Sequence, residues 1–161
     1  MVEIRIRRAH EEDYPFITEL WSEMMNYHLS LDPRFELAFD SDESYLEYLH
    51  SIRDHYDYIV LVAETDKRIV GYTIGMILSN PSVFALTRYG FIAEMSVTEE
   101  FQHAGVGKQL WDYLRRWFYR RGVAVIQLNV SPQNQKGYEF WTRMGCREFL
   151  HILWYDIPKK L

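Results

Sequence analysis

Residues 91–121, FIAEMSVTEEFQHAGVGKQLWDYLRRWFYRR, hold the pattern that decides the fold. The apolar run at 91–97 predicts a strand, and large apolar residues then recur at helical spacing between 110 and 118. Gly105 and Gly107 lie between the two, where they permit a sharp turn and close approach of the backbone to a ligand. Because the first amides of a helix have no intrahelical partner, this strand–loop–helix unit predicts a site for a phosphate group.

Two common phosphate-binding loops are excluded by specific residues. A Walker A loop requires Gly where Gln102 stands and Ser or Thr after the lysine, where Gln109 follows Lys108. The dinucleotide fingerprint G-x-G-x-x-G requires a third glycine, and Leu110 occupies that position. A third pattern, Q/R-x-x-G-x-G/A, matches residues 102–107 in full.

In this loop the sequence resembles the GNAT (general N-acetyltransferase) superfamily. The strand ending at Val97 lies five residues before Gln102, as it does in that family. Residues 134–146, NQKGYEFWTRMGC, resemble its second signature, N-x-x-A-x-x-L-Y-x-K-x-G-F, and the opening IRIRRA at 4–9 resembles its usual start. The resemblance covers essentially the whole chain.

The rest of the chain predicts one α/β domain spanning 1–161. Strands are expected near 4–7, 58–63, 69–78, 91–97, 123–130 and 149–157, and helices near 10–28, 40–56, 110–118 and 134–144. Helices interleaved with strands indicate a mixed sheet that is covered on both faces. The resemblance implies a GNAT fold, with a central, mostly antiparallel sheet of six to seven strands and about four flanking helices.

Composition narrows the partners and the compartment. The net charge of −5 disfavours nucleic-acid binding, and no apolar run is long enough to span a membrane. The lone Cys146 cannot form an intrachain disulfide, so a reducing, cytoplasmic location is expected. The six His are scattered and there is no Cys pair, so no metal site is predicted.

The resemblance implies acetyl-CoA as co-substrate and assigns most of its site. Backbone groups of the strand end would pair with the pantetheine arm, and those of the loop would hold the pyrophosphate. Asn134 would contact the pantetheine region, or cap its helix, or do both. The residues so assigned are Met95, Ser96, Val97, Gln102, His103, Ala104, Gly105, Val106, Gly107, Lys108, Asn134 and Trp141.

The expected chemistry is direct attack of a primary amine on the thioester in a ternary complex. Glu94 interrupts an apolar strand and is predicted as the general base, or else it is a carboxylate facing solvent at the strand end. Trp141 stands where the family usually has an acidic Tyr, and an indole cannot supply the proton. Tyr138, one turn earlier, is predicted to replace it as the acid, or else to pack.

The acceptor is expected to be a cationic small-molecule or peptide amine. Residues 32–57 contain eight acids against Arg34 and Arg53, and an acidic rim attracts cations. Tyr27, His28 and Phe35 fall in the same region and are predicted to contact the acceptor. Trp141 also supports a different class of function, a non-catalytic acyl-CoA-binding or sensing module. The apolar segment 149–157 indicates either a homodimer edge or an internal strand.

Overall fold

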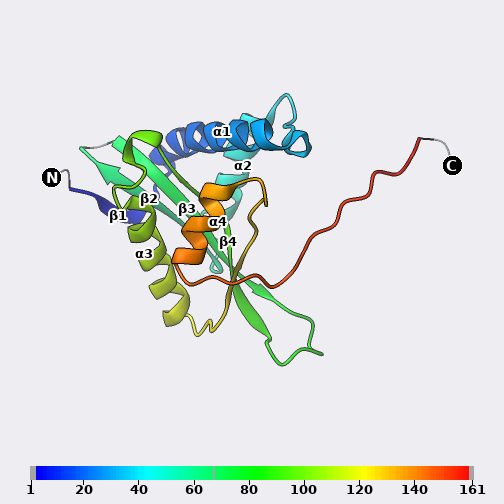
Figure 1. Ribbon diagram of the computed structural model, residues 1–161. Helices are drawn as coiled ribbons and strands as arrows, with labels where there is room; N and C mark the ends of the chain where they lie inside the picture. The colour runs from blue at the N-terminus through cyan, green and yellow to red at the C-terminus, as the bar shows by residue number, and fades with distance from the viewer. Residues whose placement is uncertain (1–2, 67, 160–161) are drawn as a thin grey trace.

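A five-stranded sheet forms the centre of the computed structural model, which describes residues 3–66 and 68–159. The strands are β1 (Arg5–Arg8), β2 (Tyr58–Thr65), β3 (Arg68–Ser79), β4 (Arg88–Val97) and β5 (Ile126–Leu128). They lie in the order β1-β2-β3-β4-β5; each neighbouring pair from β1 to β4 is antiparallel, and β5 is parallel to β4. The mixed, mostly antiparallel sheet predicted from the sequence is confirmed (Figure 1).

Helices cover both faces of this sheet. They are α1 (Tyr14–Leu31), α2 (Ser41–Ile52), α3 (Val106–Arg120) and α4 (Gln135–Arg143), with short 3-10 turns at Glu11–Asp13, Pro33–Phe35 and Glu99–Phe101. Side chains of α1 and α2 form one core with one face of β2 and β3, and side chains of α3 form a second core with the other face. The four predicted helices are therefore present, in two layers around the sheet (Figure 1).

The contact between α3 and the sheet is close because two strand positions lack a side chain. A Cβ atom at Gly75 would lie 2.5 Å from Leu114, and one at Gly90 would lie 2.6 Å from Phe118. Leu114 and Phe118 are both fully buried. Since real side chains do not approach so closely, these glycines bring α3 onto the sheet and position the loop before it.

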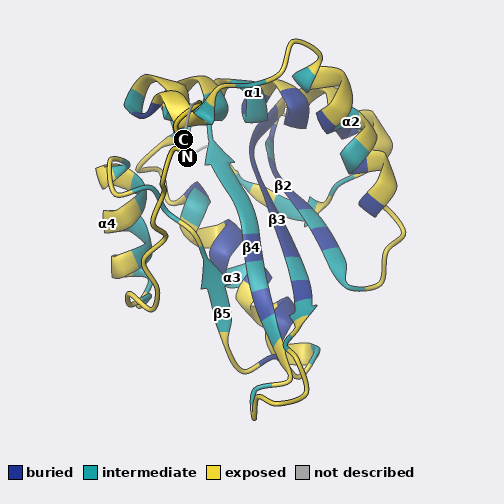
Figure 2. Ribbon diagram, turned by 90° about the vertical axis from the view of Figure 1, so that its right-hand side faces the viewer, coloured by how far each residue is buried: buried dark blue, intermediate teal, exposed yellow. Residues whose placement is uncertain are grey.

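The strand predicted at 149–157 is not formed, so the sheet has five strands rather than six to seven. This segment is extended, pairs with no described strand, and exposes its apolar side chains (Figures 1 and 2). An apolar, β-branched and aromatic sequence favours extended backbone, but a strand also needs a neighbouring edge for its peptide groups. The strand predicted at 123–130 is likewise shorter, because only 126–128 pairs with β4.

The ends of two predicted helices also differ. The first begins with a 3-10 turn and becomes α-helical only at Tyr14, where Pro15 occupies the first turn. The second ends at Ile52, so Tyr56 lies beyond it and is exposed. Within the ranges that the structure describes, every helix is too short or too polar to cross a membrane.

Candidate functional site

Strands β4 and β5 separate partway along their length and leave an opening in the sheet. Their pairing runs from Gly90 with Ile126 to Ile92 with Leu128 and then stops, whereas β4 continues to Val97. Beyond Ile92, β4 is paired only with β3, so one edge of its peptide groups is open among the described residues. This edge belongs to the three residues predicted to pair with the pantetheine arm, Met95, Ser96 and Val97.

A cavity of about 310 Å³ lies where the two strands part. It is formed by the C-terminal half of α1, the turn after it, β4, the segment that follows β5, and α4. Its lining residues are Met24, Met25, His28, Phe35, Ile92, Ala93, Glu94, Met95, Leu128, Asn129, Val130, Ser131, Asn134 and Trp141. Six of the predicted site residues therefore meet here: His28, Phe35, Glu94, Met95, Asn134 and Trp141.

A β-bulge in β4 directs Glu94 toward the α1 and α2 side of the sheet. Ile74 pairs with Glu94 and Gly75 pairs with Ile92, so Ala93 is one residue in excess. Side chains alternate between faces along a regular strand, and Glu94 would then share the face of Ile92, which packs with α3. The extra residue reverses the alternation, and bulges of this kind are frequent next to active sites.

Two tyrosines hold the carboxylate of Glu94. The hydroxyls of Tyr45 on α2 and Tyr72 on β3 both donate to its Oε2 atom, at 2.5 Å and 2.8 Å. Trp21 stacks on Tyr45, with ring centroids 4.2 Å apart. Glu94 is therefore held by side chains from α2 and β3 in the wall of the cavity rather than placed at a solvent-facing strand end.

Burial controls the protonation of this cluster. It raises the pKa of Glu94 above the ordinary glutamate value, while the hydrogen bonds from Tyr45 and Tyr72 partly oppose that shift. Burial, followed by the nearby Glu94 charge, raises the pKa of both tyrosines. The tyrosines therefore stay protonated and act as donors, and the Glu94 carboxylate binds a proton more tightly than an ordinary glutamate does.

His28 presents one ring nitrogen to the same cavity. Its Nδ1 lies 2.8 Å from the carbonyl oxygen of Met24, and because a carbonyl only accepts, Nδ1 carries the hydrogen. In the neutral ring Nε2 is then an acceptor, and it lies 3.5 Å from the Nδ2 atom of Asn134. The ring of Phe35 packs against that of His28, with ring centroids 5.1 Å apart. Tyr27 is 40% exposed and does not line the cavity.

The glycine-bearing loop presents a row of backbone amides. His103 and Gly105 have positive φ angles of 65° and 81°, so the chain turns sharply before α3 begins. The amides of His103 and 105–108 make no hydrogen bond with any residue that the structure describes. This is the arrangement that holds phosphate groups at a helix N-terminus. The loop is tied to the strand because the Gln102 side chain donates to the carbonyl of Val97 at 3.2 Å.

The other predicted site residues take separate positions. Lys108 pairs with Asp112 on the next turn of α3. Asn134 accepts a hydrogen bond from the amide of Gly137 at 3.0 Å, so it caps α4 while also lining the cavity. Tyr138 does not line the cavity, and its hydroxyl donates to Glu148 at 3.2 Å.

The acids near the predicted acceptor side divide into two groups. Asp32 is bound by Arg34, whose hydrogen bonds lower the pKa of Asp32 to about 2, and Asp54 and Asp57 are also ion-paired with arginines. The other five are exposed on or just before α2, without an ion pair among the described residues. These five are Glu36, Asp40, Asp42, Glu43 and Glu47.

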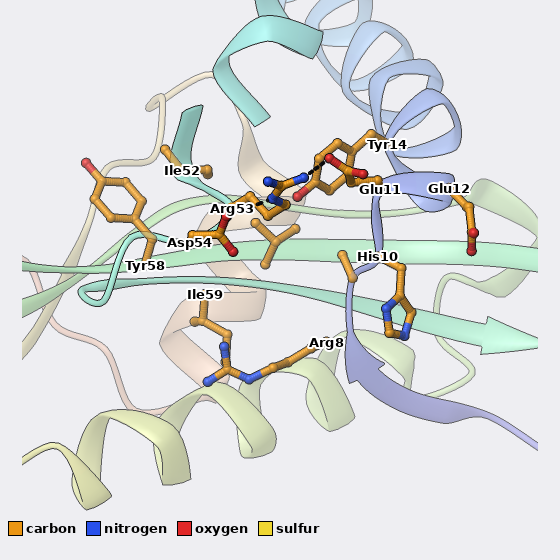
Figure 3. A pocket seen from close by; sticks show the side chains of 12 residues that line it. Arg8, His10, Glu11, Glu12, Tyr14, Ile52, Arg53, Asp54, Tyr58 and Ile59 are labelled. Carbon is orange, nitrogen blue, oxygen red and sulfur yellow. Dashed lines mark hydrogen bonds and ion pairs between the residues drawn. The ribbon is translucent and has the colours of Figure 1, made fainter. Parts of the chain in front are cut away.

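A second, larger hollow of about 510 Å³ lies at the opposite edge of the sheet, beside β1 and the start of β2 (Figure 3). Its charged groups largely neutralise one another, with Glu11 paired to Arg53 and Arg53 to Asp54. It contains none of the residues predicted for catalysis or cofactor binding. Over 3–66 and 68–159, no three His, Cys, Asp or Glu side chains gather as metal ligands would.

Comparison with known families gives one match. Residues 14–146 match the model of the acetyltransferase (GNAT) family, and this range includes the open edge of β4, the amide loop and α4. No curated protein matches the chain.

Solved structures share its fold at low sequence identity. A tetramutant of the BH1408 protein from Bacillus halodurans is 17% identical, with a TM-score of 0.84 and coverage of 95% of this chain and 99% of that one. Aminoglycoside N-acetyltransferase AAC(6')-Iy in complex with CoA is 18% identical, with a TM-score of 0.77 and coverage of 98% and 96%. Aminoglycoside 6'-N-acetyltransferase AAC(6')-IG from Acinetobacter haemolyticus is 16% identical, with a TM-score of 0.76 and coverage of 96% and 98%.

Proposed function

Since the chain belongs to the acetyltransferase (GNAT) family, we propose that it transfers the acetyl group of acetyl-CoA to a primary amine. Transfer is direct, within a ternary complex. The observation that carries the proposal is the position of Glu94, a half-buried carboxylate in the wall of the cavity at the point where the open edge of β4 begins. This position supports a role for Glu94 as a base beside the backbone that would hold a thioester.

The co-substrate site uses backbone groups more than side chains. The free amides of His103 and 105–108 would bind the pyrophosphate, and the open edge at 95–97 would pair with the pantetheine arm. Asn134 and Trp141 would close the site from α4. The similar fold of AAC(6')-Iy, which was solved with CoA, supports this assignment. No metal is needed for the reaction.

Glu94 would act as the general base. An alkyl amine has a reference pKa of roughly 10.4, so it arrives protonated at neutral pH and must lose a proton before it attacks. Glu94 takes that proton directly or through a water molecule, and its raised pKa suits the task. The amine then attacks the thioester carbonyl, the C–S bond breaks, and CoA leaves as a thiolate.

The departing thiolate has two candidate partners on α4, Trp141 and Tyr138. Trp141 lines the cavity and can donate a hydrogen bond from its indole, but it cannot release a proton. Tyr138, which was predicted from the sequence as the acid, would first have to leave Glu148. A thiol has a reference pKa of about 8.5, so a thiolate stabilised by a hydrogen bond can leave and take its proton from water.

We further propose that the acceptor is a cationic small-molecule amine. The exposed acids on and before α2 lie on the same side of the sheet as the cavity, where they would concentrate cations. Two aminoglycoside acetyltransferases share the fold, and this supports the same general class of acceptor without naming one. A cytoplasmic location and one domain spanning 1–161 stay predictions from the sequence.

The test combines calorimetric titration of acetyl-CoA with measurement of thiol release against a panel of amines. Binding together with release that one amine class stimulates is the expected result. Binding without release across the panel would favour the second candidate function, a non-catalytic acyl-CoA sensor, which the presence of Trp141 and the orientation of Tyr138 support. Failure to bind acetyl-CoA or free CoA would contradict both.

A further inference from the structure

The hollow beside β1 and the start of β2 has the size of a ligand site, and the proposed acetyl transfer does not use it. Its volume of about 510 Å³ falls within the usual range for small-molecule pockets, roughly 300–1,000 Å³. Ile52, Ile59 and Val60 give it an apolar lining. Ile59 belongs to the core on the α3 side of the sheet, and Ile52 to the core on the side of α1 and α2. The hollow therefore extends around the edge of β2 from one face of the sheet to the other (Figure 3).

The edge of β2 that borders the hollow carries two free peptide groups. β1 ends before it reaches residues 58–60, so this part of β2 has no described strand on its outer side. The carbonyl of Asp57 accepts from an amide of β3, whereas the carbonyl of Val60 accepts from Ala9 on the outer side. Because the peptide groups of successive strand residues point in opposite directions, those of Tyr58 also point outward. The carbonyl of Tyr58 and the amide of Val60 make no hydrogen bond with any described residue.

Tyr14 supplies a polar group to the same space. It lies at the start of α1, lines the hollow and is only 2% exposed, with its ring packed edge-on against His50. Its hydroxyl makes no hydrogen bond within the part of the chain that the structure describes, yet it is not sealed off as the unpaired hydroxyls of Thr65 and Thr98 are. Since nearly all buried polar groups have a partner, this hydroxyl is available to whatever occupies the hollow.

Opposite charges lie at the two ends of this open edge. Asp54 is in the turn that leads into Tyr58, and it uses only its Oδ2 atom to bind Arg53, so Oδ1 has no partner among the described residues. At the other end, Arg8 lies next to the residue that pairs with Val60, and it forms no ion pair over 3–66 and 68–159. An acid thus accompanies the free carbonyl, and a base accompanies the free amide.

We propose that the hollow binds a free α-amino acid with an aliphatic side chain. A carbonyl and an amide two residues apart on one strand edge can engage both backbone groups of a single residue beside them, as in a parallel ladder. The ammonium group of the ligand donates to the carbonyl of Tyr58 and pairs with Asp54. Its carboxylate accepts from the amide of Val60 and the hydroxyl of Tyr14, and pairs with Arg8. Its side chain lies against the apolar lining.

The balance of charge in the hollow favours a ligand that carries both signs. Three acids, two arginines and one histidine line it, so a ligand with a single charge would meet like as well as opposite charges. A dipolar ligand pairs with both and leaves neither end unmatched. The site lies at the opposite edge of the sheet from the cavity that contains Glu94, so the inference does not rest on the proposed acetyl transfer.

The first test is an NMR titration of the full chain with L-leucine, followed through backbone amide shifts. We expect saturable changes at 8–14 and 52–60. Isoamylamine lacks the carboxylate, isocaproate lacks the ammonium and N-acetyl-leucinamide lacks both charges, so each should bind roughly tenfold more weakly or worse. No saturable change with L-leucine, or equal affinity for any of the three analogues, overturns the proposal. Changes confined to the residues around Glu94 also overturn it, because L-leucine would then be an acceptor for the proposed transfer.

The second test uses matched variants. Tyr14→Phe removes only the hydroxyl and should raise the Kd for L-leucine roughly tenfold, whereas Tyr119→Phe, at an 82% exposed position on α3, should leave it unchanged. Arg8→Gln should weaken binding similarly, with Arg5→Gln at the other end of β1 as its control. Since Arg8 is exposed, this second pair decides the matter if Tyr14→Phe does not fold. Glu94→Gln should keep full affinity for L-leucine. Equal Kd values within both pairs, or loss of binding in Glu94→Gln, would show that the hollow is not the site.

Discussion

The Oε2 atom of Glu94 accepts hydrogen bonds from the hydroxyls of Tyr45 and Tyr72. Its other oxygen, Oε1, has no hydrogen-bond partner among the described residues. One oxygen is therefore used to hold the carboxylate and the other is available to an amine. Replacing Glu94 with Gln keeps the size of the side chain and removes the proton acceptor. We expect kcat to fall roughly 100-fold to 10,000-fold, the usual contribution of a general base, with little change in acetyl-CoA affinity.

Thiol-release kinetics and calorimetric titration of acetyl-CoA measure the two effects separately. Glu23→Gln is the control, because Glu23 is exposed on α1 directly before the cavity residue Met24. It should leave kcat unchanged. Equal losses of kcat in the two variants would mean that Glu94 is not the base.

Tyr72 should determine the pH at which Glu94 becomes active. The hydrogen bond from its hydroxyl stabilises the carboxylate form and lowers the pKa of Glu94 against the larger opposing effect of burial. Tyr72→Phe removes that donor, so the pKa of Glu94 should rise. Because the base works only when deprotonated, the ascending limb of kcat/KM against pH should move to higher pH.

The free energy of unfolding should fall as pH rises, over the same range in which activity increases. The folded-state pKa of Glu94 is raised above its unfolded value, so the folded protein binds the proton more tightly between those two values. Its contribution to the free energy of unfolding is thus largest below the ordinary glutamate pKa and falls as pH rises through the raised value. Glu94→Gln should remove this dependence in denaturant titrations at several pH values. A purely packing role for Tyr72 would change stability and leave the ascending limb of kcat/KM in place.

Sequence reasoning could find Glu94 but not its partners. A carboxylate inside an apolar strand has no packing reason to be there, so it is visible without a structure. Tyr45 and Tyr72 lie 49 and 22 residues away in the chain, on α2 and β3, and each fits the apolar pattern of its own element. Only the tertiary arrangement shows that their hydroxyls converge.

At the scale of elements, the amide loop depends on the left-handed conformation of Gly105. Its φ angle is 81°, and an added Cβ would meet nothing within 4 Å, so Gly105→Ala introduces backbone strain without a steric clash. The strain costs about 1 kcal/mol and should shift the loop, which raises the Kd for CoA.

Gly122 provides the control for this substitution. It lies just past the other end of α3 with a φ angle of 72°, again with nothing within 4 Å of an added Cβ. Gly122→Ala should lose similar thermal stability but retain CoA affinity in calorimetric titration. Equal affinities for the two alanine variants would show that the loop does not hold the co-substrate.

Elements with a strong internal pattern could be predicted, and elements that depend on a neighbour could not. The apolar stripe of α3, from Leu110 to Phe118, is buried as its spacing requires. The segment 149–157 has an equally strong strand composition, yet it pairs with no strand among the described residues. A helix closes its hydrogen bonds within itself, whereas a strand needs a second edge that composition does not specify.

Considered as a whole, the molecule carries its net charge of −5 unevenly. The exposed acids on and before α2 should attract a cationic acceptor over distances comparable with the Debye length, about 10 Å at 0.1 M salt. The KM for the amine should therefore rise with ionic strength in steady-state assays. Glu43→Gln with Glu47→Gln should weaken that dependence.

The control for the Glu43 and Glu47 double variant removes two acids from another part of the surface. Glu12→Gln with Glu19→Gln neutralises two exposed acids at the start of the chain, away from the cavity lining. The salt dependence of KM should survive in this variant. If both pairs reduce it equally, overall charge governs the attraction and the acids near α2 have no special part.

The prediction for the co-substrate side rests on local sequence, whereas the prediction for the acceptor side depends on tertiary structure. Unpaired backbone amides at a helix N-terminus favour a phosphate group, so the glycine loop at 102–108 predicts its ligand from local sequence alone. The proposed acceptor side draws on α1, the turn after it and α2, and three of the eight acids at 32–57 are ion-paired with arginines.

The single extra residue at Ala93 has a consequence for reading related sequences. The extra residue shifts the alternation of side chains by one position. Before it, even-numbered residues such as Ile92 face α3, and after it, odd-numbered residues such as Met95 face α3. An alignment that forbids a gap here would equate Glu94 with an interior hydrophobic position in any relative whose strand is regular. Ancestral reconstruction and residue grafting within this fold therefore need the insertion to be scored as a unit together with the carboxylate that follows it.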